Sequence, residues 1–320
     1  MAERYPVWFE RPVLPELKAT VEQRTEILGP RTEASPYAGL SEARGSVVGA
    51  STFDAEWIGR APQMQVIART GIGVDKVDVG EATRRGIVVC NAPDGPTIST
   101  AEHAVALILA MAKDLKGSAR RLQAGETNLY AGYTGVELAG KTLGLVGYGR
   151  IARRVAGAGR GLGMNVVAYD PFCPATEFGA TLPAGSLEGV LQAADVVSVH
   201  VPLTDETARL FGAAAFGAMK EGAVFVNTAR GGLVDHEALL VALESGRLFG
   251  AGLDVTEPEP LPPDHPLLNR DDVIVTPHVA SGTADGKRRL FESAFEQVLM
   301  VLDGERPTHV VNPEVWDRQE

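Results

Sequence analysis

The chain has 320 residues, of which 45% are hydrophobic and 22% are charged, so it carries enough apolar material for a folded core and is not a disordered chain. At about 100–200 residues per domain, this length predicts two domains. Lys and Arg number 30 against 41 Asp and Glu, a net charge of −11, which argues against nucleic acid or an anionic membrane as the main partner.

Short β-branched runs alternate with helical patterns along the whole chain, and this alternation indicates βαβ units and mostly parallel sheets. The first series of predicted strands is Val7–Phe9, Glu26–Leu28, Val47–Ala50, Val66–Arg69 and Ile87–Cys90. A long helical stretch is expected around Thr100–Leu122. The second series is Leu143–Val146, Asn165–Tyr169, Val196–Val201, Val224–Thr228, Ala251–Val255 and Val273–Thr276, with a helix expected over Ala238–Ser245. Each series is large enough for one doubly wound α/β domain.

The two cysteines, Cys90 and Cys173, are too few for a disulfide framework or a Cys-based zinc site. Such sparse cysteine is typical of a reduced, cytoplasmic protein. The segment Met1–Pro6 carries charge and proline where a signal peptide would have an apolar run. The longest apolar run, Ala104–Ala112, is too short for a membrane span, which needs about 20 residues. We therefore expect a cytoplasmic protein that does not bind a membrane.

A glycine-rich loop follows the first strand of the second series. Gly147 and Gly149 begin a G-x-G-x-x-A pattern that ends at Ala152. The first glycine permits a tight turn, the second lets the backbone approach a pyrophosphate, and the small alanine permits close helix–strand packing. The N-terminus of the helix that follows offers free N–H groups to phosphates. The pattern has the strand before it and the helix after it that a dinucleotide site requires.

An acidic residue closes the next strand. Asp170 lies 23 positions after Gly147. A carboxylate there accepts hydrogen bonds from the adenosine ribose hydroxyls and repels a 2′-phosphate, so the sequence favours NAD over NADP. The alternative interpretation of Asp170 is a structural one, in which the carboxylate only stabilises a turn at the end of the strand.

Polar residues follow several strands of the second series, and the carboxyl ends of parallel strands meet at the ligand-binding edge of a sheet. Arg230 can bind a substrate carboxylate or carbonyl oxygen, His278 can exchange the hydroxyl proton, and Glu259 can orient the imidazole. Asp254 and His200 lie at the same edge. This set suits hydride transfer to a 2-keto acid. Each residue also has a structural alternative: Arg230 could form a surface ion pair, His278 could be a structural residue with its hydrogen bonds satisfied, and Glu259 could be solvated.

The spacing of the histidines does not indicate a metal site. The six histidines, at positions 103, 200, 236, 265, 278 and 309, include no HxxxH or HxH pair. We therefore expect no metal.

At these residues the chain resembles the D-isomer-specific 2-hydroxyacid dehydrogenase family over nearly its whole length. The motifs that carry the resemblance are Arg69–Asp75, Gly147–Ile151, His200–Thr204, Val226–Gly231, Gly252–Val255 with Glu259-Pro260, and Thr276–His278. They occur in the family's order, which makes the match specific.

The resemblance implies an α/β architecture in which a Rossmann NAD-binding domain is inserted into a flavodoxin-like substrate domain. The substrate domain would comprise residues 1–99 and 287–320, and the NAD-binding domain residues 100–286. It also implies a homodimer formed through the NAD-binding domain, for which Ala101–Ala112 is a candidate interface, although a core helix explains that segment equally well.

The resemblance assigns site roles by position. Arg230, Glu259 and His278 take the family's catalytic positions. The substrate-binding residues expected are Arg69, Ile72 and Gly73, the last two through backbone N–H groups. The cofactor-binding residues expected are Gly147, Gly149, Arg150, Ile151, Asp170, His200, Pro202, Thr228 and Asp254.

The predicted function is an NAD-dependent D-2-hydroxyacid dehydrogenase that acts on the CH–OH group of a small 2-hydroxy acid. Phosphoglycerate dehydrogenase and glyoxylate/hydroxypyruvate reductase are the leading interpretations of its substrate. Pro96 stands where relatives commonly carry Asn, which leaves the substrate open. The alternative function is an NAD(H)-sensing protein-interaction module of the corepressor kind, since such relatives keep similar site residues.

Overall fold

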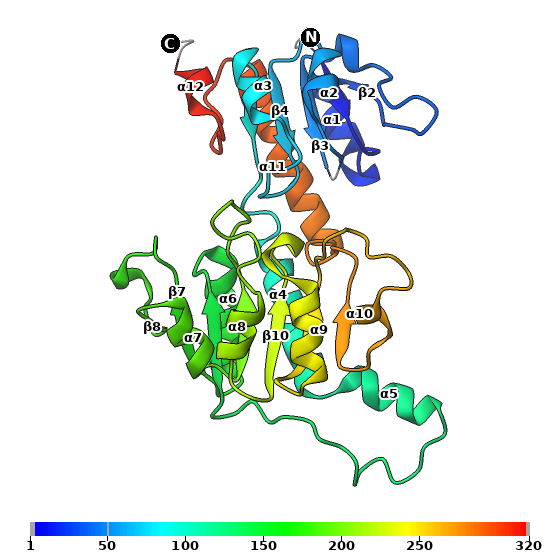
Figure 1. The fold of residues 1–320 in the computed structure, drawn as a ribbon. Helices are drawn as coiled ribbons and strands as arrows, with labels where there is room; N and C mark the ends of the chain where they lie inside the picture. Colours follow the sequence, from blue (N-terminus) through cyan, green and yellow to red (C-terminus); the bar gives the residue numbers. More distant parts are fainter. Residues whose placement is uncertain (1–3, 50, 318–320) are drawn as a thin grey trace. The chain divides into compact units, whose positions relative to one another are not determined.

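The structure is a computed structural model that describes residues 4–49 and 51–317, and the chain in it divides into two compact units (Figure 1). The first unit comprises Met1–Pro96 and Thr283–Glu320, and the second comprises Thr97–Gly282. The second unit is therefore inserted into the sequence of the first. A substrate role for the first unit stays a prediction. No helix in the described ranges is both long and apolar enough to cross a membrane.

The first unit contains a five-stranded parallel sheet in the order β2-β1-β3-β4-β5. This is the strand order of the flavodoxin-like doubly wound fold. The strands are β1 (Tyr5–Phe9), β2 (Thr25–Leu28), β3 (Gly45–Val48), β4 (Val66–Arg69) and β5 (Val88–Cys90). The helices are α1 (Lys18–Arg24), α2 (Ala55–Gly59), α3 (Val79–Arg84), α11 (Ala284–Leu302) and α12 (Pro313–Trp316), with 3-10 turns at Pro15–Leu17 and Leu40–Glu42.

Aromatic side chains fill the core on both faces of this sheet. On one face the long helix α11 lies against β3, β4 and β5 and stacks Phe291 on Phe9, with ring centroids 5.7 Å apart. On the other face Trp8 meets Trp57 at 5.7 Å. The buried Asn312 accepts a hydrogen bond from the Val89 N–H at 2.7 Å, which ties the C-terminal segment to β5.

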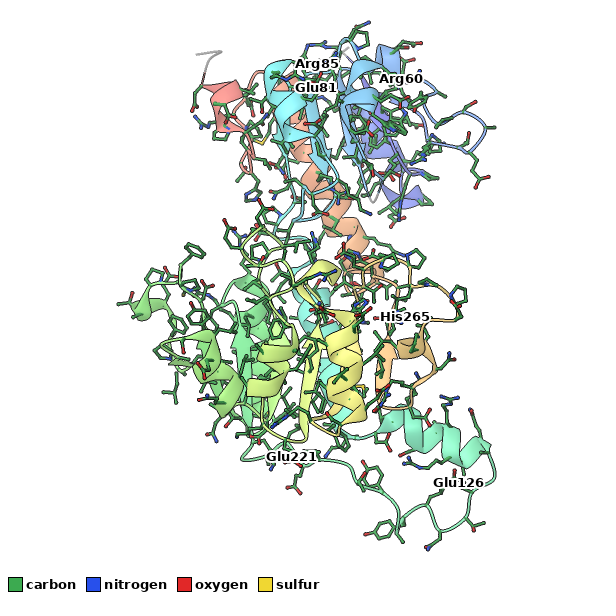
Figure 2. The ribbon with its side chains drawn as sticks, viewed as in Figure 1. Arg60, Glu81, Arg85, Glu126, Glu221 and His265 are labelled. Atoms are coloured by element: carbon green, nitrogen blue, oxygen red, sulfur yellow. The ribbon has the colours of Figure 1, made fainter. Side chains whose placement is uncertain are left out.

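Polar side chains fix the short helices of this unit. Asp78 caps α3 by accepting a hydrogen bond from the Glu81 N–H at 2.8 Å. The Glu81 carboxylate is buried and accepts a hydrogen bond from Arg85 at 2.5 Å (Figure 2). A buried carboxylate needs such a partner, because desolvation penalises an unpaired charge.

The second unit contains a seven-stranded parallel sheet in the order β12-β11-β10-β9-β6-β7-β8. The strands are β6 (Thr142–Val146), β7 (Asn165–Tyr169), β8 (Leu182–Pro183), β9 (Val196–Val199), β10 (Ala223–Asn227), β11 (Leu248–Leu253) and β12 (Val273–Val275). The helices are α4 (Thr97–Ala112), α5 (Leu115–Gln123), α6 (Arg150–Gly161), α7 (Leu187–Ala193), α8 (Ala213–Ala218), α9 (His236–Glu244) and α10 (Pro266–Asn269), with 3-10 turns at Ala175–Glu177 and Gly231–Leu233. The order reverses between β6 and β9, which is the switch point at which Rossmann folds bind dinucleotides. The predicted fold class is confirmed.

Every predicted strand overlaps an observed one, but several details of the prediction are wrong. The strand β8 was not expected, because it has two residues and one is a proline, which only a sheet edge tolerates. The predicted strand Val196–Val201 ends at Val199. The end of the predicted strand Val47–Ala50 lies outside the described residues.

The single long helix expected around Thr100–Leu122 is also wrong. Two helices, α4 and α5, occupy this stretch, because Asp114 adopts a left-handed conformation with φ of +44° that no α-helix can continue. The apolar side chains of α4 pack against β10, β11 and α6. One side of the segment Ala101–Ala112 thus belongs to the core, and its predicted place at a subunit interface stays a prediction.

Candidate active site

The glycine loop between β6 and α6 has the shape that a phosphate group requires. Gly147 has φ of +88°, and a Cβ there would lie 2.7 Å from the His200 carbonyl oxygen, so a side chain is excluded. Gly149 occupies the N-cap of α6, where no side chain caps the helix. A Cβ at Gly149 would meet no atom of the described residues within 4 Å, so the space above it is open with respect to them. The first N–H groups of α6 can therefore reach an anion placed over this loop.

Asp170 lies directly after β7, next to this loop. One carboxylate oxygen accepts the Tyr148 N–H at 2.8 Å, and the other accepts the Phe172 N–H at 2.9 Å. These two bonds hold the carboxylate beside the glycine turn. Each oxygen keeps a further lone pair for a ribose hydroxyl.

Two more of the predicted cofactor residues lie after neighbouring strands. His200 follows β9, and its Nε2 lies 2.9 Å from the Ser198 Oγ. Burial lowers the pKa of His200 to about 4, so the ring is neutral at pH 7. Thr228 follows β10, and its buried Oγ1 has no hydrogen-bond partner in the described part of the chain. A buried hydroxyl without a partner is uncommon and costs free energy unless a ligand satisfies it.

These features fit a dinucleotide. Three features of the described residues lie at the carboxyl edge of one sheet: open space above Gly149, a helix N-terminus without a side-chain cap, and the unsatisfied Thr228 hydroxyl. Arg150 and Ile151 form the first turn of α6, and Pro202 follows His200 in the loop after β9. Direct contact of each of these residues with the cofactor stays a prediction.

The structure brings Glu259 and His278 together, although they lie on different loops of the second unit. The Nδ1 atom of His278 lies 2.8 Å from the Glu259 Oε1. Both side chains are partly exposed, at 44% for the histidine and 34% for the glutamate, so a substrate can reach them. Because Nδ1 is engaged by the carboxylate, Nε2 is the ring atom left to exchange a proton.

Asp254 supports the turn that carries His278. Its carboxylate accepts the N–H groups of Val279 and Ala280, each at 2.9 Å, and the Thr276 hydroxyl at 2.6 Å. The His278 N–H in turn donates to the Asp254 carbonyl oxygen at 2.7 Å. The carboxylate of Asp254 is fully buried, and these partners all come from the protein. Its predicted contact with the cofactor is untested.

The turn after β10 positions Arg230. The buried Asn227 accepts the Ala229 N–H at 2.9 Å and donates to the Arg230 carbonyl oxygen at 2.8 Å, which fixes the backbone of this turn. A Cβ on Gly231 would lie 2.1 Å from the Thr256 carbonyl carbon. The turn therefore packs directly on the segment that leads from β11 towards Glu259. The Arg230 Nη1 donates to the Ala229 carbonyl oxygen at 2.7 Å.

A pocket of about 470 Å³ adjoins the histidine–glutamate pair. Asp254, Glu259 and Thr276 contribute its polar wall, and Leu261 and Leu268 are among its apolar lining residues. A mostly apolar cavity with a few fixed polar groups is typical of a small-molecule site.

The predicted substrate-binding loop lies in the first unit and follows β4. Arg69 donates from Nε to the Gly73 carbonyl oxygen at 3.1 Å, and Asn91 donates to the Ile72 carbonyl oxygen at 2.8 Å. Within residues 4–49 and 51–317, the N–H groups of Ile72 and Gly73 have no protein acceptor. Two free N–H groups on a fixed loop can bind a carboxylate.

Sequence reasoning missed three residues that shape this site. Asn227 sets the Arg230 turn, while Thr276 and His103 contact Asp254. Asn227 and Thr276 lie inside motifs that were recognised, but no role followed from their position. His103 carries no sequence signal of its own. In the described ranges, no group of three or more His, Cys, Asp or Glu residues is arranged to hold a metal ion.

Comparison with known proteins identifies the family. The family model described as "D-isomer specific 2-hydroxyacid dehydrogenase, NAD binding domain" matches residues 105–280. The chain belongs to the D-isomer-specific 2-hydroxyacid dehydrogenase family. The resemblance inferred from the sequence motifs is confirmed, and so is NAD as the cofactor of the matched domain.

The relatives include two kinds of enzyme. The chain is 43% identical to a D-3-phosphoglycerate dehydrogenase from Archaeoglobus fulgidus, over 81% of this chain and 49% of that protein. It is 40% identical to a glyoxylate reductase from Korarchaeum cryptofilum, over 82% of this chain and 80% of that protein. The solved structure of the TT0316 protein from Thermus thermophilus matches with a TM-score of 0.86 and 40% identity, covering 96% of this chain and 99% of that one. The chain spans about half the length of the phosphoglycerate dehydrogenases it matches.

Proposed function

We propose that this protein is an NAD-dependent oxidoreductase that interconverts a small D-2-hydroxy acid and its 2-keto acid. The observation that carries the proposal is the 2.8 Å pair of His278 and Glu259, at the edge of the sheet that also holds the glycine loop. A histidine that can exchange a proton, placed at the same sheet edge as a dinucleotide site, provides the two groups that oxidation of an alcohol requires. Family membership supports the same reaction class.

Each residue of the site has a separate role in the proposed reaction. NAD, when bound, supplies the acceptor for the hydride that leaves the substrate carbon. His278 takes the hydroxyl proton at Nε2 during oxidation and returns it during reduction. Glu259 holds the imidazole through Nδ1 and stabilises the imidazolium that forms. Arg230 binds the substrate carboxylate or carbonyl oxygen with its planar guanidinium. The family resemblance implies that the backbone N–H groups of Ile72 and Gly73, in the first unit, bind the carboxylate.

The substrate is a choice between phosphorylated and small unphosphorylated acids, since relatives of both kinds match. NADH oxidation with glyoxylate, hydroxypyruvate, pyruvate, 2-ketoglutarate and phosphohydroxypyruvate, assayed side by side, tests the proposal. Turnover of at least one of these acids supports it. Preference for phosphohydroxypyruvate would assign Arg69 a role in phosphate binding. Failure of all five acids with NADH bound would contradict the proposed reaction. The relatives are a dehydrogenase and a reductase, so they give no support to the corepressor-like alternative.

Cofactor preference provides a prediction at Asp170. We expect Asp170→Ala to weaken NADH binding and to relax discrimination against NADPH, because the carboxylate repels the 2′-phosphate. Since one charge-assisted hydrogen bond contributes about 1.5–3 kcal/mol, the NADPH/NADH ratio of kcat/KM should rise by about tenfold or more. Initial rates with both cofactors measure it.

A matched variant separates charge from loop structure. Asp170→Asn keeps an oxygen for the Tyr148 N–H, but it removes the negative charge and the acceptor of the Phe172 N–H. It should relax the preference with less loss of NADH affinity than Asp170→Ala. An unchanged preference in both variants would show that Asp170 does not face the ribose.

We also propose that the protein is a homodimer in which α5 and the loop that follows it contact a second copy. This segment, residues 115–141, is called the arm below, and it extends from the rest of the second unit (Figure 1). It exposes large apolar side chains, including Leu115, Leu122, Tyr133 and Tyr130, the last 96% exposed. Exposed apolar groups gathered on one segment are typical of an interaction surface.

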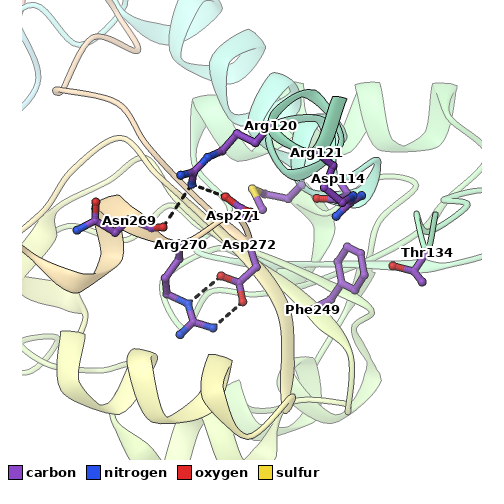
Figure 3. Close-up of a pocket in the computed structure, with 10 residues that line it drawn as sticks. Asp114, Arg120, Arg121, Thr134, Phe249, Asn269, Arg270, Asp271 and Asp272 are labelled. Carbon is purple, nitrogen blue, oxygen red and sulfur yellow. Dashed lines mark hydrogen bonds and ion pairs between the residues drawn. The ribbon is translucent and has the colours of Figure 1, made fainter. Parts of the chain in front are cut away.

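The base of this arm is held firmly. Lys116 donates from Nζ to the carbonyl oxygens of Arg270 and Val273, each at 2.7 Å. Beside it lies a pocket of about 520 Å³ in which Arg120 pairs with Asp271, and Arg270 with Asp272 (Figure 3). A fixed base presents the apolar arm to a partner at low entropic cost.

The double variant Leu122→Asp, Tyr130→Asp should shift the protein from dimer to monomer. Sedimentation velocity measures the change, and Glu126→Gln on the same arm is the control. A monomeric wild type, or a dimer that survives both changes, would show that the arm does not form the interface.

We also propose a reducing, cytoplasmic location. Its support is that both cysteines are unpaired. One of them, Cys90, is buried, and burial raises the pKa of its thiol to about 12.

A further inference from the structure

A chain of hydrogen bonds runs from helix α4 to the turn that carries His278. It begins at His103, whose Nε2 lies 2.9 Å from the Thr276 Oγ1. The Thr276 Oγ1 lies 2.6 Å from the Asp254 Oδ1, and the His103 Nε2 lies 3.4 Å from the same oxygen. All four residues belong to the second unit.

The partners determine the direction of each hydrogen bond. An ionised carboxylate only accepts, so Asp254 accepts the backbone N–H groups of Val279 and Ala280 and the hydroxyl proton of Thr276. Having donated its only proton, the Thr276 oxygen accepts from His103. The Nε2 atom of His103 therefore carries a proton. Each of the three side chains thus has a partner within the protein.

The turn that these residues hold has a strained backbone at His278. His278 has φ of +54°, a left-handed conformation that a residue with a side chain adopts only at a cost. Asp254 bonds to the turn on both sides of His278, through Thr276 before it and through Val279 and Ala280 after it. The Glu259 carboxylate fixes the ring, whereas Asp254 fixes the backbone from which the ring projects.

We propose that His103 is a positioning residue for the catalytic imidazole. It donates to Thr276 and thereby keeps that hydroxyl directed at Asp254, so that the carboxylate holds the His278 turn. Helix α4 suits this role because it is packed on β10 and β11, which gives His103 a rigid base. The inference rests on the proposed function, since it takes His278 as the acid–base residue.

A pair of variants at His103 tests the role in turnover. Leu cannot donate, whereas the side-chain amide of Gln can place a donor near the position of Nε2. Because misplacement of a reacting group by about 1 Å can cost 100-fold, we expect His103→Leu to lower kcat roughly 10- to 100-fold. The NADH affinity and the KM for the keto acid should change less than about twofold. His103→Gln should recover most of kcat. The control is Glu102→Gln, which changes an exposed residue of the same helix.

A second measurement does not depend on activity. Hydrogen exchange at the Val279 and Ala280 amides reports whether Asp254 still holds the turn. We expect His103→Leu to speed this exchange by about tenfold or more while the amides of β11 keep wild-type protection. Thr276→Val, with Thr276→Ser as the variant that keeps the hydroxyl, tests the same contact if the His103 variant does not fold.

The outcomes separate the two proposals. If wild type turns over no keto acid, the proposed function fails, and hydrogen exchange alone decides whether His103 holds the turn. If His103→Leu matches wild type in both kcat and amide exchange, the positioning role is wrong. A fall in kcat that His103→Gln does not recover, with unchanged exchange, would also overturn it.

Discussion

His278→Ala should lower kcat by about 10²–10⁴-fold and leave NADH binding nearly intact. General acid–base catalysis contributes about that factor, and the variant lacks the imidazole that exchanges the hydroxyl proton. The NADH affinity should hold because the glycine loop and Asp170 are built from β6, β7 and α6, away from the turn that carries His278. Steady-state kinetics with the best keto acid, together with fluorescence titration of NADH, measures both quantities.

A second variant shows whether Glu259 acts through the imidazole. Glu259→Gln keeps an oxygen that can accept from Nδ1 but removes the negative charge that stabilises an imidazolium. We expect a smaller loss of kcat than in His278→Ala, and the double variant should lose little more than His278→Ala alone. Turnover of His278→Ala at the wild-type rate would contradict the assignment of the acid–base residue, and losses that simply add would contradict the coupling.

The dinucleotide site could be predicted from the sequence because its chemistry is local. Gly147, Gly149 and Asp170 lie at fixed distances along one strand–turn–helix–strand unit, so spacing alone predicts their place. The structure adds what spacing cannot give: the His200 carbonyl oxygen excludes a side chain at Gly147, and the Thr228 hydroxyl is buried without a partner in the described part of the chain.

The proximity of Glu259 and His278 could be predicted only in part. The rule that parallel strands end at one edge places both near the site, since they follow the neighbouring strands β11 and β12. Glu259, however, lies in a loop well beyond the end of β11, and its 2.8 Å contact depends on how that loop folds back. The close packing of Gly231 on Thr256 shows one contact that shapes this loop, and it joins segments far apart in sequence.

The role of His103 could not be predicted at all. Its contacts with Thr276 and Asp254 require helix α4 to pack on β11 in one register, and no local pattern specifies that register. The break between α4 and α5 was missed for a related reason. The residues around Asp114 favour a helix, and only the left-handed backbone at this one position interrupts it.

Arg230→Lys should lower kcat/KM by about 10- to 100-fold, although the positive charge is kept. A guanidinium donates two parallel hydrogen bonds to a carboxylate or to a carboxylate and a carbonyl oxygen, whereas an ammonium is a single point charge on a flexible stem. The loss of one charge-assisted hydrogen bond, about 1.5–3 kcal/mol, corresponds to that factor. Steady-state kinetics on the keto acid measures it.

Arg230→Gln, which also removes the charge, should lose about 10²–10⁴-fold in kcat/KM. Both variants should raise KM and lower kcat together, because the developing charge on the carbonyl oxygen is bound more tightly in the transition state than in the ground state. Asn227 fixes the backbone of this turn through Ala229 and the Arg230 carbonyl oxygen, so neither substitution should move the turn itself. If Arg230→Gln keeps the wild-type KM and kcat, the substrate is held by other groups and the role assigned to Arg230 is wrong.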